Sequence, residues 1–347
     1  AFRHFAPGRR RAVKARGYVL ASTLSILLLI STIALAVSFM GRLEHKAAER
    51  RSEKRQAELA ARSGLAFAES KLDNLEGAYF SLVLLDHTET WDSADLPALP
   101  FSFIVRLEDE AGKLDLNLAT VEMLERLGFT SQQAQGIVSW REERPFAAVW
   151  ELEEALGTGA LQETGDLASF LTLWSRSPNL NPEGRPKLQL GNFTAQELVA
   201  ASGGEVSSSV AERLERAQIT QLSQLAEVVE NKEELAEVVD WIADAEGADR
   251  GKININTAPV EVLRTIPGFT DELVEIIYQR RHSAPFTRLA ELVRLDAFSL
   301  SFWAECAAWV TVGSSAFSLE AEGSYRQGIK RIFAVYSEGR YLYWQED

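Results

Sequence analysis

The sequence is poor in the residues that cross-link a chain or bind a metal. Its one cysteine, Cys306, excludes an intrachain disulfide. Its four histidines lie too far apart in the sequence to form a local metal-binding motif. The chain also lacks a Ser/His/Asp order, an HExxH pair, a nucleophile elbow and a glycine-rich phosphate loop, so the sequence predicts a protein that is not an enzyme. The histidines are His4, His45, His87 and His282.

Negative charge is missing from the first 17 residues, which contain six basic residues and therefore carry +6. The whole chain has a formal net charge of −14, so the remainder is near −20. Such an acidic body disfavours a polyanionic partner, because binding DNA usually needs a basic face that releases counterions. The six basic residues are Arg3, Arg9, Arg10, Arg11, Lys14 and Arg16.

Charge of either sign is missing from residues 18–40, a run of 23 residues. A helix of that length spans about 35 Å, which is enough to cross a bilayer. The basic residues before the run predict a cytoplasmic N-terminus by the positive-inside bias, with the body exported. The sequence therefore predicts a basic leader (1–17) and a transmembrane helix (18–40).

Proline is missing between Arg42 and Leu85, where apolar residues recur among mixed charges at helical spacing. One long amphipathic helix is therefore predicted to continue from the membrane over residues 41–86. Strands are predicted next, because residues 101–107 and 317–347 alternate between apolar and polar side chains.

The C-terminal strands are predicted to form a meander joined at Gly323 and Gly339. They would complete an antiparallel sheet with the strand at residues 101–107. The sheet regions are thus 87–111 and 313–347.

Two segments of the body repeat at an offset of 139 residues. The stretch KLDLN at 113–117 matches KININ at 252–256, and each repeat ends in a short strand-like run, at 171–173 and 310–312. We interpret residues 112–175 and 251–312 as two helical units. A weaker third copy begins at 187–198, within a linker and helical region at 176–250, and is expected to have lost its helix pair.

Each unit resembles a helix-hairpin-helix, a module that often binds the DNA backbone. In the later unit, Asn256 or Thr257 is predicted to cap the first helix, and Gly268 to make the turn between helices. DNA-binding turns commonly carry a second glycine and a lysine that reach a phosphate, but here Thr270 and Asp271 follow. The units are therefore predicted to be structural, and nucleic acid is not an expected partner.

An acidic stretch between the units offers the strongest candidate metal ligands. Its carboxylates surround Gly247 and could hold a calcium ion. The spacing is not that of an EF-hand, which favours a solvated helix end and loop, although calcium stays an open alternative. The candidate ligands are Asp240, Asp244, Glu246 and Asp249.

The N-terminus is similar to a type IV prepilin signal. A basic leader ends in Gly17, an aromatic residue follows at Tyr18, and an apolar helix continues into a polar one. The resemblance implies that prepilin peptidase cleaves between Gly17 and Tyr18 and that the new N-terminus is methylated. Most pilins have a glutamate at the fifth mature position, which neutralises a neighbour's N-terminal amine, but this chain has Ser22. A subunit without that carboxylate suits a filament end.

Taken together, these features resemble the minor pseudopilin K (GspK) family of type II secretion. The resemblance rests on the prepilin-like start without the glutamate, the long helix, the DEAGK motif at 109–113, the INTAP motif at 255–259 and the strand-rich tail. It implies an α+β fold in which a pilin-like helix and a small antiparallel sheet carry a large all-helical insertion.

The same resemblance implies a place at the tip of the pseudopilus, where the protein would help to start assembly. The implied partners are the minor pseudopilins I, J and H, the major pseudopilin, prepilin peptidase and the inner-membrane assembly platform. The body would lie in the bacterial periplasm, and no cofactor is expected. Three alternatives stay open: a ComEA-like DNA-uptake receptor, a type IV pilus minor pilin, and a generic anchored scaffold.

Overall fold

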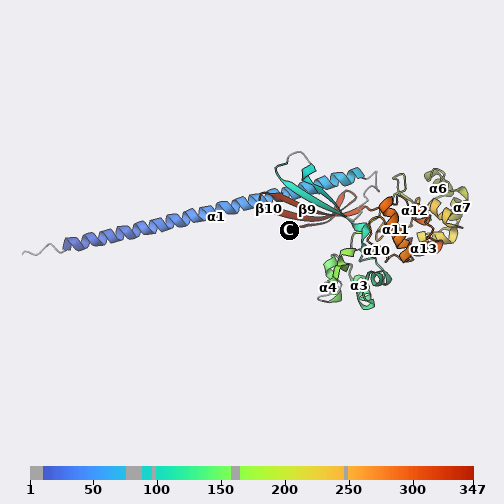
Figure 1. Ribbon diagram of the computed structural model, residues 1–347, viewed down its shortest axis with the longest axis horizontal. Coiled ribbons are helices and arrows are strands. Elements are labelled where there is room, and N and C mark those ends of the chain that lie inside the picture. Colours follow the sequence, from blue (N-terminus) through green and yellow to red (C-terminus); the bar gives the residue numbers. More distant parts are fainter. Residues whose placement is uncertain (1–10, 76–87, 96–98, 158–164, 246–248) are drawn as a thin grey trace, which may run out of the picture.

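The chain has an α+β fold built around one long helix, as expected from the sequence. The computed structural model describes residues 11–75, 88–95, 99–157, 165–245 and 249–347. Helix α1 (Arg11–Leu75) projects as a single rod, with the sheet against its C-terminal part and the other helices beyond the sheet (Figure 1). The predicted helix is continuous through Leu75, and residues 76–86 of that prediction lie outside the described residues.

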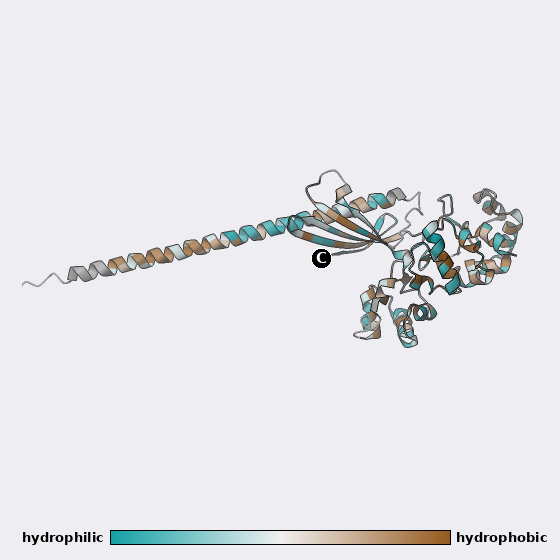
Figure 2. Cartoon of the chain, in the orientation of Figure 1, coloured by the Kyte–Doolittle hydropathy of each residue, from teal (hydrophilic) through white to brown (hydrophobic). Residues whose placement is uncertain are grey.

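Residues 18–40 of α1 are apolar and uncovered, and form the largely brown stretch of the helix in Figure 2. Its most apolar window has a mean hydropathy of 2.3 and none of it is buried. In the described part of the chain, this is the one helix whose length and composition allow it to cross a membrane. The structure thus contains the apolar helix that the charge-free run at 18–40 predicts.

Five antiparallel strands form the sheet, in the order β1-β2-β9-β10-β11. Strand β2 alternates as the sequence predicts: Phe103, Val105 and Leu107 are buried towards α1, and the residues between them face outwards. The strands are β1 (Thr88–Asp92), β2 (Ser102–Asp109), β9 (Ala316–Tyr325), β10 (Gly328–Ser337) and β11 (Arg340–Glu346).

Helix α1 lies directly on the backbone of β9 and β10. A Cβ atom at Gly323 would lie only 2.1 Å from Ala57 O and 2.2 Å from Ala61 N, and one at Gly328 would lie 2.7 Å from Glu53 O. Small residues on the helix, such as Ala57 and Ala61, complete this close approach. The contact buries apolar side chains of α1 and of the sheet in one core.

The predicted joint at Gly323 is wrong, and the close contact explains why. Gly323 lies inside β9, where it pairs with Lys330; the strand continues to Tyr325, and Arg326 and Gln327 make the turn. The joint at Gly339 is confirmed, because β10 ends at Ser337 and β11 begins at Arg340.

The remaining helices are inserted between two neighbouring strands of the sheet, β2 and β9. They form a first, a middle and a last unit, which share one hydrophobic core. Each unit opens and closes with a two-residue strand, and these two strands pair in parallel.

The three units share a common plan, in which the opening strand is followed by two helices, further short helices and the closing strand. The first unit contains β3 (Leu114–Asp115), α2 (Val121–Leu127), α3 (Ser131–Glu143), η3 (Val149–Glu151), α4 (Leu152–Leu156), η4 (Gly165–Phe170) and β4 (Leu171–Thr172). The middle unit contains β5 (Leu188–Gln189), α6 (Ala195–Ala201), α7 (Ser208–Ala217), η5 (Leu222–Gln224), α8 (Leu225–Val228), α9 (Lys232–Val238) and β6 (Ile242–Ala243). The last unit contains β7 (Ile253–Asn254), α10 (Val260–Leu263), α11 (Asp271–Ser283), α12 (Leu289–Val293), α13 (Leu300–Cys306) and β8 (Val310–Thr311).

The expectation that the third copy had lost its helix pair is wrong. In the middle unit, Thr194 caps α6 and Ser207 caps α7, and each side chain accepts a hydrogen bond from a backbone N–H of the first turn. The first helix begins seven residues after the opening strand begins, as it does in the other two units. The middle copy has therefore kept the architecture while losing most of the matching letters.

The contact between α1 and β9 generates a stability prediction. We expect Gly323→Ala to lower the free energy of unfolding of the detergent-solubilised chain by about 3 kcal/mol or more, because a new methyl group would meet helix backbone that cannot rotate away. Gly41→Ala, in α1, is the control, because a Cβ there meets nothing within 4 Å. Equal denaturation curves for the two variants would contradict the close contact.

Candidate functional site

The predicted processing site lies in a continuous helix. Gly17, Tyr18 and Ser22 are all part of α1, and Tyr18 is 80% exposed. The Ser22 hydroxyl donates a hydrogen bond to Val19 O at 2.9 Å, a contact within its own helix. The nearest acidic residue along the helix is Glu44, far beyond the apolar run. Among the residues that the structure describes, no carboxylate therefore lies beside the predicted N-terminal amine.

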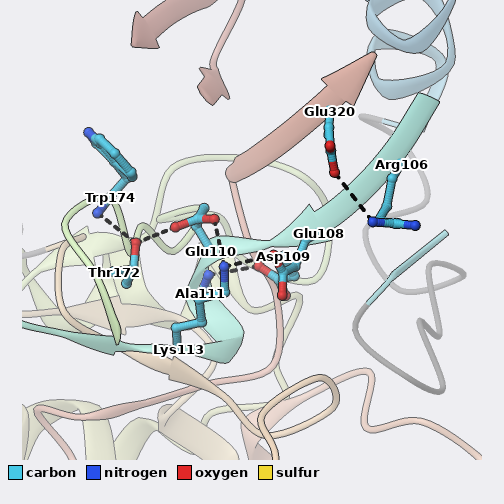
Figure 3. A network of polar contacts seen from close by, with 9 residues as sticks. All are labelled: Arg106, Glu108, Asp109, Glu110, Ala111, Lys113, Thr172, Trp174 and Glu320. Atoms are coloured by element: carbon cyan, nitrogen blue, oxygen red, sulfur yellow. Dashed lines mark hydrogen bonds and ion pairs between the residues drawn. The ribbon is translucent and has the colours of Figure 1, made fainter. Parts of the chain in front are cut away.

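A buried carboxylate, that of Asp109, joins the sheet to the last unit, and Figure 3 shows its contact with Ala111. Asp109, at the end of β2, is 2% exposed. Its Oδ2 accepts hydrogen bonds from Asn254 Nδ2 at 2.9 Å and Thr257 Oγ1 at 2.6 Å, and its Oδ1 accepts one from Ala111 N at 2.8 Å. Burial raises the pKa of Asp109, against the lowering effect of these donors.

The next residue joins the sheet to the first unit (Figure 3). The Thr172 hydroxyl, in the closing strand β4, donates a hydrogen bond to the buried Glu110 carboxylate. Lys113 Nζ lies 3.1 Å from Glu110 Oε1 and 2.8 Å from Glu108 Oε2. Burial opposes the charge on Lys113, but the two carboxylates outweigh it and raise the pKa of the ammonium group.

The DEAGK motif therefore has a physical role that the sequence analysis missed. Gly112 fits against Thr257, since a Cβ on it would lie 3.0 Å from the Thr257 Oγ1 atom. Two adjacent acids at a strand end are buried as hydrogen-bond acceptors, one for each flanking unit. The signal in the sequence was the motif itself, but its partners lie 62 and 145 residues away.

The first and last units share the same pair of hydrogen bonds between an asparagine side chain and the backbone of a phenylalanine. Asn117 donates to Phe146 O at 3.0 Å and accepts from Phe146 N at 2.8 Å, and Asn256 makes the same pair of hydrogen bonds with Phe286. The predicted capping role of Asn256 or Thr257 is therefore wrong. Helix α10 begins after Pro259 without a side-chain cap, because both residues are committed to other partners.

In the first and last units, an element of the same unit lies close to the turn between the paired helices, although Gly128 itself is exposed. A Cβ on Gly268 would lie 3.1 Å from Glu305 Cβ and 3.3 Å from Phe302 O, so α13 lies against this turn. In the first unit, Gly128 similarly faces Leu167 at 3.5 Å. A carboxylate and an apolar side chain thus stand where a phosphate would have to approach, which disfavours these turns as nucleic-acid sites.

The candidate calcium ligands have separate partners in the structure. The Asp240 carboxylate accepts hydrogen bonds from Leu289 N and Ala290 N, and Asp244 accepts one from Leu222 N. Asp249 lies 3.7 Å from an Arg176 nitrogen, and Glu246 lies outside the described residues. Over the part of the chain that the structure describes, no three His, Cys, Asp or Glu side chains cluster as a metal site, and calcium stays a prediction.

Two lysines lie beside these acids, around a cavity of about 250 Å³ between the middle and last units. Burial lowers the pKa of Lys187 to about 8, against the opposing effect of Asp240, and burial also lowers the pKa of Lys252. Lys252 Nζ lies 3.9 Å from Asp244 Oδ2. Lysine side chains of the protein itself therefore lie beside Asp240 and Asp244.

No protein-family model and no curated protein matches the chain. Among solved structures, a chain of the GspK–GspI–GspJ complex from the type 2 secretion system of enterotoxigenic Escherichia coli is similar, with 13% sequence identity and a TM-score of 0.35. The match covers 84% of this chain and 99% of that chain. A likeness of this size carries no conclusion about function.

The junction predicts that Asp109 cannot be replaced by its amide. An asparagine would place its NH₂ against either Ala111 N–H or the Asn254 and Thr257 donors, leaving buried donors unsatisfied. We expect Asp109→Asn to lower the free energy of unfolding by about 1–3 kcal/mol at neutral pH, as measured by denaturant titration.

The matched control is Glu320→Gln, on the exposed face of the sheet, where the carboxylate contacts Arg106 at 3.3 Å. Because both side chains of that ion pair are largely exposed, the control should change stability by less than about 0.5 kcal/mol. An Asp109→Asn variant as stable as the control would contradict the structural role of the carboxylate.

Asp115 predicts a pH dependence. Burial raises its pKa to about 6, against the opposing effects of the Asn117 backbone N–H and the Arg250 and Arg141 guanidinium groups. The folded state therefore holds the proton more tightly than the unfolded state, and the free energy of unfolding should fall as the pH rises from about 4 to about 6. The last unit has Asn254 at the matching position.

We expect Asp115→Asn to remove this dependence and to raise the free energy of unfolding by about 1–3 kcal/mol at pH 7, with little effect below about pH 4. The measurement is denaturant unfolding at a series of pH values. Asp271→Asn is the control, because the Asp271 side chain is 85% exposed. A pH profile unchanged by Asp115→Asn would show that this carboxyl titrates normally.

Proposed function

We propose that the chain is a minor pseudopilin of a type II secretion system that acts at the tip of the pseudopilus and helps to start its assembly. The observation that carries the proposal is helix α1, whose uncovered apolar half continues without a break into a half that packs on an antiparallel sheet. That arrangement serves as a membrane anchor first and as a filament spine afterwards. The role is structural, and no catalysis is proposed.

The tip position is supported by Ser22 and by the bulk of the helical units. A subunit inside an apolar filament would need a carboxylate to neutralise its neighbour's N-terminal amine, but the Ser22 hydroxyl bonds to its own helix. The three units add a wide head beyond the sheet, as Figure 1 shows. Both features suit a position with no subunit above it.

The remaining assignments follow from this proposal. Prepilin peptidase would cleave the leader after Gly17, and the body would face the periplasm with the helix in the inner membrane. The other minor pseudopilins, I, J and H, the major pseudopilin and the assembly platform would be the partners. The Glu305 side chain, which lies against the turn of the last unit, argues against a DNA-uptake receptor.

The proposal predicts the mature N-terminus. In cells that contain prepilin peptidase, mass spectrometry of the purified membrane protein should find Tyr18 as an N-methylated first residue. Gly17→Val should leave the leader attached, because a side chain at the cleaved residue does not fit the processing signal, and Gly41→Ala in the same helix should be processed normally. An intact leader on the unaltered protein would contradict the proposal.

A further inference from the structure

A stripe of four basic side chains runs along one face of α1 between the apolar run and the sheet. The cationic stripe consists of Arg42, Lys46, Arg50 and Lys54, spaced four residues apart, so that they share one face of the helix. All four residues are exposed. None of them forms an ion pair with a carboxylate within the described residues, although Arg42 Nε donates to Ser38 O.

The cationic stripe continues the face of α1 that the sheet covers farther along. Ala57 follows Lys54 by three residues, Ala61 follows by four more, and Leu65 and Ala68 continue the face into the buried core. The sheet reaches only as far as Glu53 and Lys54, where Gly328 lies against the helix backbone. The same face is therefore covered by the chain's own sheet after Lys54 and uncovered before it.

This segment is the basic part of an otherwise acidic body. Residues 42–55 contain six basic and three acidic residues, a net charge of +3, and residues 56–347 therefore carry −23 of the total of −14. The segment appears as the teal stretch of α1 between the brown run and the sheet in Figure 2. Glu49 and Glu53 lie on or beside this face, but within the described residues neither is within ion-pair distance of the four cations, and Glu49 lies 3.4 Å from His45.

The length of the cationic stripe decides between a lipid and a protein partner. From Arg42 to Lys54 the helix rises about 18 Å, whereas charges in physiological salt are screened over about 8 Å. Lipid headgroups at the end of the apolar run can therefore neutralise Arg42 and Lys46, but not the farther half. Only a partner that lies alongside the helix can reach all four cations.

We propose that the cationic stripe binds the acidic face of a neighbouring subunit's N-terminal helix, which lies parallel to α1 between the apolar run and the sheet. The inference rests on the proposed function, because it requires subunits whose helices lie side by side. A second copy of this chain does not fit, since its own stripe would bring like charges together. The partner is therefore a different prepilin-like subunit, with carboxylates spaced three or four residues apart on one face.

The test compares two charge reversals in the full-length protein. Lys46→Glu with Arg50→Glu reverses the stripe, and Arg51→Glu with Arg55→Glu makes the same change in charge on an adjacent face of the same helix. Each variant is produced together with the minor pseudopilins of the same system and purified in mild detergent. We expect the stripe variant to recover at least about tenfold less of one partner, and the control to stay within about twofold of the unaltered protein.

Reversal of the carboxylates on that partner's helix should restore recovery of the stripe variant. Equal recovery with both variants would overturn the docking proposal while leaving the proposed function intact, whereas an unaltered protein that recovers no pseudopilin would overturn both. Vesicles of phosphatidylglycerol and of phosphatidylcholine provide the lipid arm. If the stripe reversal weakens binding to the anionic vesicles but not to any pseudopilin, the cations serve the membrane surface and the docking proposal fails.

Discussion

The architecture depends on how closely α1 lies on the sheet. At Gly323 and Gly328 the helix backbone and the strand backbone are in direct contact, which leaves no room for side chains between them. That approach fixes where the sheet sits along the helix, so the described part of α1 before Glu53 projects alone. One face of α1 therefore changes character along its length: it is apolar over residues 18–40, cationic at the cationic stripe, and lined by small residues such as Ala57 and Ala61 where the sheet lies against it.

A second constraint comes from inserting about two hundred residues between neighbouring strands. Strands β2 and β9 can stay paired only if the insertion returns to its starting point, because hydrogen-bonded strands lie about 4.8 Å apart. Each unit satisfies this requirement by pairing its own opening and closing strands in parallel. The buried carboxylates of Asp109 and Glu110 then fix the first and last units to the sheet, since a buried acceptor without its donors would be costly.

Much of the fold was predictable because its signals are local. The apolar run predicts an uncovered helix, alternation at Phe103, Val105 and Leu107 predicts a strand, and the 139-residue offset predicts two related units. The helix pair of the middle unit was not predicted because Gly191 stands where the other units have Asn117 and Asn256. The sequence of the middle unit therefore lacks the asparagine that bonds to a phenylalanine in the other two. Its opening and closing strands lie far apart in the sequence and pair only in the folded chain. The middle unit therefore has the same architecture without the asparagine motif.

The sequence by itself determined the apolar run, the long helix, the α+β class and the absence of an acid at Ser22, because each depends on composition or on spacing within one segment. The tertiary structure alone decided that Gly323 serves a contact and not a turn, since that contact joins residues more than 260 positions apart. It also decided that Asp109 is a buried acceptor and that the cationic stripe is uncovered. Burial and hydrogen bonding between distant segments depend on both segments, so neither can be read from one segment of the sequence alone.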